Sequence, residues 1–148
     1  MATLHAYLNF EGNCEEAFQF YTQVFDAKVL GTVRFGDMPE DPNYPVAETD
    51  KHKIMNIAIM INENTMLLGS DCLESFQQKV NFGNSTYVML DTESAEEAKN
   101  LFSRLSANAK VMEMELGETF WAEQFASFQD KFGIFWMINF EGNKKMEY

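Results

Sequence analysis

A pattern repeated about 80 residues apart constrains the fold of this chain more than any other feature. In each copy a residue that can cap a helix is followed three positions later by glutamate, Asn13 by Glu16 and Ser94 by Glu97, which is the spacing of a capping box. Apolar residues then recur at i, i+3, i+4 and i+7, the period of one helix face. These stripes are Ala17, Phe20, Tyr21 and Val24, and Ala98, Leu101, Phe102 and Leu105, at a constant offset of 81 residues. The chain therefore predicts an internal duplication, with modules over about residues 1–80 and 81–148.

Strands are expected before and after each helix. The segments 3–10 and 85–90 alternate in the period of two, and an offset of 80 matches His5 with Ser85 and Tyr7 with Tyr87. Further strands are expected at 29–35, 54–62 and 65–70 in the first copy, and at 111–116, 119–128 and 134–140 in the second. Each copy is then a βαβββ module. The expected fold class is α+β, with the two modules forming a cupped mixed sheet and the helices on its outer face.

Size and charge narrow the classes of function. The 148 residues, 46% of them hydrophobic, suit a single domain with a sizeable core. A net charge of −12 repels phosphate backbones and anionic lipid, so we expect no nucleic-acid partner. No apolar run approaches the ~20 residues of a membrane span, and no signal-peptide pattern opens the sequence. We therefore expect no membrane partner and a cytoplasmic location.

The cysteines and the prolines are local features. Cys14 and Cys72 form no CxxC pair and have no histidine at metal-ligand spacing, so we interpret them as reduced structural residues rather than as a thiol catalyst or a zinc site. All three prolines fall within residues 38–45, in an insertion between Gly36 and Lys53. This insertion is interpreted either as a cover over a pocket or as an inert surface loop.

Two of the expected strands carry a mixed second face. Their apolar faces should pack on the helices, and they consist of Ile57, Ile59 and Ile61 in one case and Ile134, Trp136, Ile138 and Phe140 in the other. The opposite faces hold Asn56, Ala58 and Met60, and Phe135, Met137 and Asn139. Apolar walls with a few polar groups suit a small-ligand pocket, and a dimer interface uses similar residues. Both interpretations stay open.

Motifs at the two ends of the chain resemble those of a known family. The first is Tyr7-Leu8-Asn9-Phe10 with Gly12, Glu16-Ala17, Phe20-Tyr21 and Phe25, and the second is Trp121, Phe125, Asp130, Phe132-Gly133 and Trp136. With the βαβββ duplication, they resemble the PhnB-like branch of the vicinal oxygen chelate superfamily, which includes glyoxalase I, extradiol dioxygenases and bleomycin-resistance proteins. The resemblance covers nearly the whole chain, although Lys131 stands where the family pattern has proline. It implies a homodimer, with the modules paired either within one chain or across the dimer.

The resemblance also implies where a metal would bind. Enzymes of the superfamily hold a divalent metal at positions on the first and last strands of each module, which fall here on His5, Leu68, Ser85 and Met137. A catalytic metal needs about three histidine or carboxylate ligands, and one imidazole beside leucine, serine and methionine cannot hold it. We therefore expect no metal and no other cofactor.

His5 is the one candidate catalytic residue. We interpret it first as a strand histidine satisfied by a neighbour, and alternatively as a hydrogen-bond donor or general base toward a bound molecule. The acidic side chains Glu113, Glu115, Glu118 and Glu123 offer oxygen atoms that a metal could use. We interpret them instead as a solvated edge, because Met112, Met114 and Leu116 are expected to take the buried side.

These observations favour a small-molecule-binding protein of the PhnB-like type without a catalytic metal. The expected ligand-binding residues are His5, Tyr7, Asn56, Leu68, Ser85, Tyr87, Trp121, Phe135 and Met137. The alternative is a superfamily enzyme of the lyase, isomerase or dioxygenase type that uses His5 with or without a divalent metal. A third possibility is an interaction module whose mixed face is buried in a dimer. Relatives of this branch are sometimes labelled ubiquinone-pathway methyltransferases, but the sequence has no Gly-rich strand-to-helix loop for a methyl donor.

Overall fold

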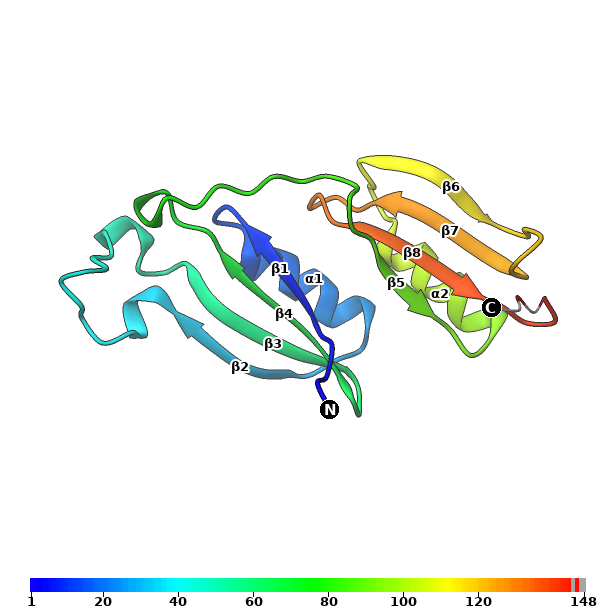
Figure 1. Cartoon of the computed structure of the whole chain (residues 1–148), viewed down its shortest axis with the longest axis horizontal. Coiled ribbons are helices and arrows are strands. Elements are labelled where there is room, and N and C mark those ends of the chain that lie inside the picture. Colours follow the sequence, from blue (N-terminus) through cyan, green and yellow to red (C-terminus); the bar gives the residue numbers. More distant parts are fainter. Residues whose placement is uncertain (145, 147–148) are drawn as a thin grey trace. The chain divides into compact units, whose positions relative to one another are not determined.

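The computed structural model describes residues 1–144 and residue 146. The chain divides into two compact units, Met1–Asn81 and Phe82–Tyr148. Each unit holds one long helix and one four-stranded mixed sheet (Figure 1). The predicted α+β class and the βαβββ order of both modules are confirmed.

In the first unit, strand β1 (Ala6–Phe10) leads to helix α1 (Cys14–Val24), which is followed by β2 (Val29–Arg34), β3 (Ile54–Asn62) and β4 (Thr65–Asp71). The sheet order is β1-β4-β3-β2, with β1 parallel to β4 and the other pairs antiparallel. The helix packs against β3 and β4. Single-turn 3-10 helices lie at Phe35–Asp37, Glu48–Asp50 and Glu74–Phe76.

Gly69 on β4 sets how closely α1 approaches this sheet. A Cβ atom at Gly69 would overlap the ring of Phe18. Phe18 is only 1% exposed, and its ring meets those of Phe10 and Tyr21 edge-on. The core stripe of α1 is therefore Cys14, Ala17, Phe18, Tyr21 and Val24, and the prediction of Phe20 in that stripe was wrong. Both sets satisfy the helical period, so the period alone does not separate them.

The start of α1 differs from the predicted capping box. The side chain of Asn13 makes no capping hydrogen bond. Instead, the buried carboxylate of Asp71 accepts the N–H groups of Gly12 at 2.8 Å and Cys14 at 3.0 Å on Oδ1, and that of Ile54 at 2.9 Å on Oδ2. A carboxylate stabilises a helix N-terminus because the amides there lack partners and carry partial positive charge. Asp71 thus joins the starts of α1 and β3 to the end of β4.

The second unit repeats this plan. It contains β5 (Val88–Asp91), α2 (Ala95–Leu105), β6 (Val111–Gly117), β7 (Gln124–Gln129) and β8 (Phe135–Phe140), in the sheet order β5-β8-β7-β6. Helix α2 packs against β7 and β8. Its predicted cap is confirmed, because Ser94 Oγ accepts the Glu97 N–H at 3.0 Å. The Glu97 carboxylate in turn accepts the N–H of Glu93 at 3.0 Å.

The turn predicted over residues 130–133 is also confirmed. The Gly133 N–H donates to the Asp130 carbonyl at 3.1 Å, and Gly133 adopts a φ of 103°, which favours glycine. The buried Asp130 carboxylate accepts the N–H groups of Phe132 and Ile134 and the indole N–H of Trp136, at 2.7–3.0 Å. Residues of the closing sequence motif therefore form one hydrogen-bonded cluster.

Three expected strands begin later than the alternation suggested. Residues 119–122 form a turn instead of the start of β7, because Thr119 Oγ1 accepts the N–H groups of Trp121 and Ala122. Strand β5 begins at Val88, opposite Trp136, because the neighbouring strand β8 itself begins only at Phe135. Strand β1 begins at Ala6 rather than at residue 3, so His5 lies just before it.

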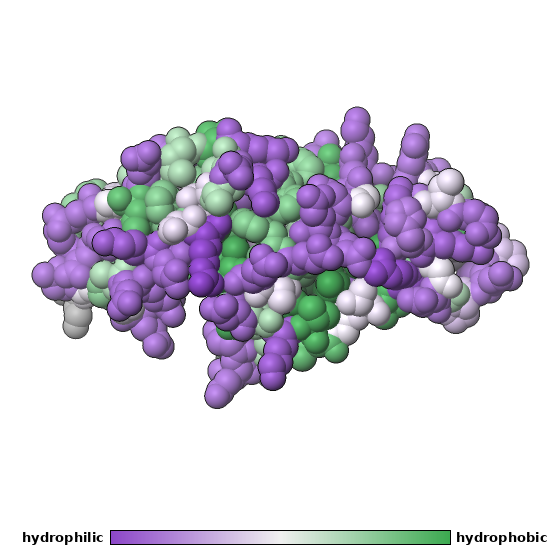
Figure 2. All heavy atoms as spheres, turned by 180° about the vertical axis from the view of Figure 1, so that it is seen from behind, coloured by the Kyte–Doolittle hydropathy of each residue, from purple (hydrophilic) through white to green (hydrophobic). Residues whose placement is uncertain are grey.

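Hydrophilic side chains cover much of the surface seen in Figure 2, which turns Figure 1 by 180°. This agrees with the net charge of −12. None of the helices in the described part of the chain is long and apolar enough to cross a bilayer.

Candidate functional site

The candidate site in the first unit is the open face of its sheet, by which we mean the face turned away from the helix. Phe10 and Gly69 both meet Phe18 of α1, so they mark the opposite, helix-facing side. Because side chains alternate along a strand, the residues beside them in the sequence belong to the open face. This open face includes Tyr7, Asn9, Asn56, Ala58, Leu68 and Ser70.

Three of the predicted ligand-binding residues are neighbours on this face. Tyr7 is 48% exposed and pairs with Leu68 across β1 and β4. The Tyr7 hydroxyl donates to Asn56 Oδ1 at 3.5 Å, at the long end of the hydrogen-bond range. The first unit thus presents a phenol and an amide beside an apolar side chain.

His5 makes a hydrogen bond that determines which ring nitrogen carries the proton when the ring is neutral. Its Nδ1 accepts the Met66 N–H at 3.1 Å, which agrees with the interpretation of a histidine satisfied by a neighbour. In the neutral ring the proton then sits on Nε2, which becomes a donor. Metal binding through Nε2 would require the other tautomer and the loss of the bond to Met66. His5 is therefore arranged to donate a hydrogen bond rather than to ligate a metal.

The open face of the second sheet is defined in the same way. Trp136 and Ile138 are fully buried, and Phe128 meets Phe102 of α2, so these residues mark the helix-facing side. Alternation along β7 and β8 then places Ser127, Phe135 and Met137 on the open face, with Met137 opposite both Ser127 and Met89.

The polar centre of this open face is a carboxylate held by two hydroxyl groups. Glu113 accepts the Tyr87 phenol at 2.8 Å on Oε1 and 2.9 Å on Oε2, and the Ser127 hydroxyl at 2.7 Å on Oε1. A register shift between Met112 and Met114 lies at Glu113. Such irregularities re-aim a side chain, which explains how an edge-strand glutamate reaches β7. We call Tyr87, Glu113 and Ser127 the carboxylate triad.

Apolar side chains lie next to the carboxylate triad. The rings of Tyr87 and Phe135 meet edge-on with their centres 5.4 Å apart. Met89 is 55% exposed and lies opposite Met137. The hydrogen bond to Glu113 raises the pKa of the Tyr87 phenol, because ionising Tyr87 would remove that bond and place a second negative charge beside the carboxylate. Tyr87 therefore remains a protonated donor at neutral pH.

Two further predicted ligand-binding residues, Trp121 and Ser85, lie outside the strand that carries Phe135 and Met137. Trp121 belongs to the turn before β7, where its ring contacts those of Phe120 and Phe125. Phe125 pairs with Asn139, near the end of β8 away from Phe135. Ser85 lies in the exposed segment that precedes β5. Tyr87, Phe135 and Met137 are thus the predicted residues that the second unit brings together.

The strand pairing corrects the predicted match between the modules. Leu68 lies opposite Tyr7, and Met137 lies opposite Met89. With Leu68 and Met137 as matched positions, Tyr7 corresponds to Met89, so the offset of the first strands is 82 rather than 80. The match of His5 with Ser85 and the match of Leu68 with Met137 therefore cannot both hold, and keeping the second matches His5 with Tyr87.

Glu113 and Ser127 are the site residues that the sequence reasoning missed. The acidic residues of β6 were interpreted as a solvated edge beneath which Met112 and Met114 were buried. Glu113 is indeed exposed on an edge strand, but it also accepts two hydroxyl groups, which the interpretation did not foresee. The expected burial of the methionines was wrong, because they are 38% and 42% exposed. The signal in the sequence was the alternation along residues 112–115, which places Glu113 and Glu115 on the strand face opposite to Met112 and Met114.

Neither cysteine provides a reactive thiolate. Burial raises the pKa of the Cys14 thiol far above its usual range, and the charges of Asp71 and Glu15 raise it further. Burial also raises the pKa of Cys72, together with the charges of Glu11 and Asp71. Because the thiolate is the nucleophile, these environments disfavour thiol catalysis.

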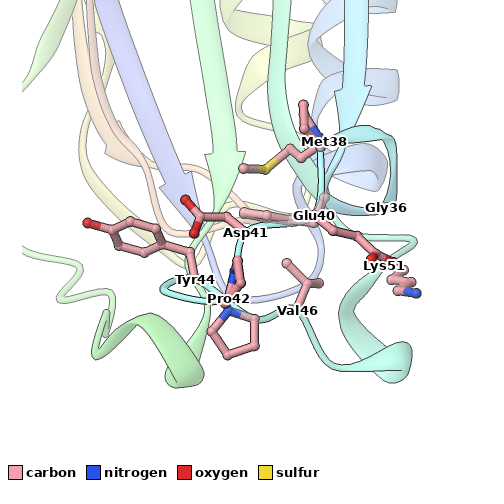
Figure 3. Close-up of a pocket in the computed structure, with 11 residues that line it drawn as sticks. Gly36, Met38, Glu40, Asp41, Pro42, Tyr44, Val46 and Lys51 are labelled. Atoms are coloured by element: carbon pink, nitrogen blue, oxygen red, sulfur yellow. The ribbon is translucent and has the colours of Figure 1, made fainter.

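The proline-containing insertion lines a pocket of about 450 Å³. Pro42 and Val46 contribute apolar wall, while Tyr44 and Lys51 lie on opposite sides (Figure 3). The Tyr44 ring contacts that of Phe76 edge-on, and the Phe76 ring contacts that of Phe35 in the same way. These ring contacts hold the insertion against the rest of the unit. The Lys51 ammonium forms an ion pair with the Glu48 carboxylate, with 2.7 Å between Nζ and Oε1. Both residues follow the proline segment of the insertion.

The residues at the superfamily's metal positions do not fit a metal. The predicted positions are His5 and Leu68 in the first unit and Ser85 and Met137 in the second, and Tyr87 replaces Ser85 if Leu68 and Met137 are kept as matched positions. His5 already uses Nδ1 as an acceptor, and the Tyr87 phenol donates to Glu113. Among the described residues, no three histidine, cysteine or carboxylate side chains are grouped so that they could hold a metal ion.

Comparison with known proteins places the chain in a family. A family model described as 3-demethylubiquinone-9 3-methyltransferase matches residues 2–139. The chain belongs to this family. The resemblance to the PhnB-like branch of the vicinal oxygen chelate superfamily is thereby confirmed.

Two relatives, and one solved structure that shares the fold, match this chain over nearly its whole length. Protein YjdN of Escherichia coli K12 is 35% identical over 139 residues, which cover 92% of this chain and 93% of YjdN. The crystal structure of PA1353 from Pseudomonas aeruginosa is 33% identical, with a TM-score of 0.83 and coverage of 95% and 98% of the two chains. A glyoxylase/bleomycin resistance protein/dioxygenase domain from Frankia sp. EAN1pec shares the fold, with a TM-score of 0.67 at 14% identity and coverage of 97% and 93%.

The family's name refers to methyl transfer, and in this member several N–H groups at the strand-to-helix turns already have side-chain acceptors. In the first unit the carboxylate of Asp71 occupies the N–H groups of Gly12 and Cys14. In the second unit the side chains of Ser94 and Glu97 occupy two N–H groups at the start of α2. Helix N-termini bind phosphate or carboxylate groups only where such amides are free.

Proposed function

We propose that this protein binds a small, partly aromatic organic molecule on the open faces of its sheets, without a catalytic metal. The carboxylate triad carries the proposal, because Tyr87, Glu113 and Ser127 form a hydrogen-bonded polar centre beside Phe135 and Met137. Small-molecule sites combine apolar walls with a few fixed polar groups.

The first open face supports the same proposal. It combines Tyr7, Asn56 and Leu68, and His5 next to it keeps an Nε2 donor. The proposed ligand-binding residues are His5, Tyr7, Asn56, Leu68, Ser85, Tyr87, Trp121, Phe135 and Met137, to which we add Glu113 and Ser127. Each unit contributes its own set.

A fragment screen by ligand-observed NMR tests the proposal. Fragments that bind the wild type should bind at least about tenfold more weakly to the double variant Tyr87→Ala/Met137→Ala, because truncation removes apolar contact from the centre of the face. The control is Gln19→Ala/Lys99→Ala, which changes exposed helix residues. The proposal fails if every fragment binds the Tyr87→Ala/Met137→Ala variant as it binds the wild type.

The alternative is an enzyme that uses His5 with or without a divalent metal. Elemental analysis of protein purified without an affinity tag separates the metal-dependent form of this alternative from our proposal. We expect less than one-tenth of an equivalent, about the background level, because His5 stands alone among candidate ligands at these positions. A stoichiometric divalent ion would contradict the metal-free proposal.

The duplication of one ancestral module, the homodimer and the cytoplasmic location also stay proposals. Light scattering coupled to gel filtration would test the homodimer, for which the expected mass is twice the chain mass of 17.1 kDa. A monomer at micromolar concentration would contradict it. Cell fractionation would test the location.

A further inference from the structure

We infer that the molecule bound by the second open face carries a positively charged nitrogen, an ammonium or a related cation, which pairs with Glu113. This inference rests on the proposed function and specifies its ligand. It begins from the hydrogen bonds of the carboxylate. Glu113 receives its bonds from two neutral hydroxyl groups, those of Tyr87 and Ser127.

Within the described part of the chain, no positively charged side chain is paired with the Glu113 carboxylate. No lysine or arginine there forms an ion pair with it. A carboxylate has about four acceptor positions, and two hydroxyl protons leave some of them open. The hydroxyl partners of Glu113 lie next to apolar side chains, since Tyr87 contacts Phe135 and Ser127 pairs with Met137. A cation that covers this face would therefore meet a negative charge without a counter-charge.

The groups around Glu113 favour an organic cation over a metal ion. Tyr87 and Phe135 provide aromatic rings, and Met89 and Met137 provide polarisable side chains. Aromatic faces attract alkylammonium groups, whereas hard metal ions require several oxygen or nitrogen ligands. The chain's net charge of −12 adds a long-range attraction for cations.

The two hydroxyl donors also argue against an anionic ligand at this place. Both the Tyr87 and the Ser127 protons are directed to Glu113, so they are unavailable to a ligand carboxylate or phosphate. Such a ligand would also meet the charge of Glu113 itself. A neutral alcohol remains the competing ligand class, because it can donate to the carboxylate without a charge.

Three probes of similar size separate these classes: phenethylamine, 2-phenylethanol and 3-phenylpropanoate. The full-length protein, labelled with ¹³C at the methionine methyl groups, is titrated with each, and the signals of Met89 and Met137 report binding. We expect phenethylamine to bind at least about tenfold more tightly than 2-phenylethanol, with no binding of 3-phenylpropanoate. The variant Glu113→Gln should remove that preference, since it keeps an acceptor oxygen but loses the charge.

The matched control is Glu115→Gln, which removes the same charge from an exposed position on the same strand. It should bind phenethylamine as the wild type does. Equal affinity for the amine and the alcohol, or an amine affinity that Glu113→Gln leaves unchanged, would overturn the inference. If 2-phenylethanol or 3-phenylpropanoate shifts the Met89 and Met137 signals and the amine does not, the cation is refuted while the proposed function stands. If none of the three binds, the inference is overturned, and the fragment screen alone decides the proposed function.

Discussion

One buried carboxylate in each unit stabilises a turn of the chain by accepting several N–H groups. Asp71 accepts the N–H groups of Gly12, Cys14 and Ile54, and Asp130 accepts those of Phe132 and Ile134 together with the indole of Trp136. Buried polar groups are stable only when they are hydrogen-bonded, and both side chains meet that condition. Each joins segments that would otherwise leave several amides without partners.

Replacing Asp71 by asparagine should therefore destabilise the protein. Asparagine has one acceptor oxygen, so its NH₂ group would face either the amides of α1 or that of Ile54, and the expected loss is about 2–4 kcal/mol of unfolding free energy. Urea unfolding followed by circular dichroism measures it. Asp91→Asn is the control, because Asp91 is exposed and accepts the side-chain amide of Asn139. Equal losses in the two variants would contradict this role of Asp71.

The titration of Tyr87 should depend on Glu113. Because the carboxylate raises the pKa of the phenol in the folded state, the folded protein keeps this proton to a higher pH than the unfolded chain does. The resulting stability is present below pH ~10 and is lost as the pH rises through the folded-state pKa. NMR of ¹³Cζ-labelled tyrosine should show a lower midpoint for Tyr87 in Glu113→Gln and an unchanged one in Glu115→Gln. An unchanged midpoint in Glu113→Gln would show that the carboxylate does not control the phenol.

At the scale of elements, the approach of α1 to its sheet depends on the missing side chain at Gly69. Gly69→Ala would push a methyl group into the buried ring of Phe18, with an expected cost of about 1–3 kcal/mol. Gly31→Ala in β2 is the matched control, since a Cβ atom there meets nothing within 4 Å, and its effect should stay within about 0.5 kcal/mol. Thermal unfolding of both variants tests the difference. A loss of similar size in Gly31→Ala would point to strand propensity rather than packing.

The order of the elements could be predicted from the sequence, because it depends on local periods and turn residues. Strand β3 has the predicted bounds, and the Asp130–Gly133 turn has the predicted hydrogen bond. Strand β7 was misplaced because its start depends on a hydroxyl group, that of Thr119, which closes a turn through bonds that an alternating pattern does not reveal.

The candidate site was predicted less completely than the fold. Apolar members such as Phe135 and Met137 follow from alternation along one strand. The bonds of Glu113 to Tyr87 and Ser127 depend instead on which residues of separate strands lie side by side and on a register shift in β6. Pairing register is set by the tertiary fold, so one strand's sequence does not contain it.

At the scale of the whole molecule, divalent metals should leave the stability unchanged. A metal bound by the folded state at 100 times its dissociation constant adds about 2.7 kcal/mol, which corresponds to at least about 5 °C in the unfolding temperature. We expect a change below about 1 °C on adding Mn²⁺, Ni²⁺ or Zn²⁺, or on adding EDTA. A rise of several degrees that His5→Ala abolishes would reveal a metal site despite the unsuited residues.

The insertion between β2 and β3 leaves and rejoins the sheet at one point. The N–H groups of Phe35 and Gly36 donate to the carbonyls of Lys53 and Lys51, and the next residue, Ile54, donates to Asp71. Backbone hydrogen bonds thus close the base of the loop, and the ring of Tyr44 within the loop contacts that of Phe76. A change in the length of residues 38–50 would therefore leave these backbone hydrogen bonds in place, but it would have to preserve the ring contact of Tyr44 with Phe76.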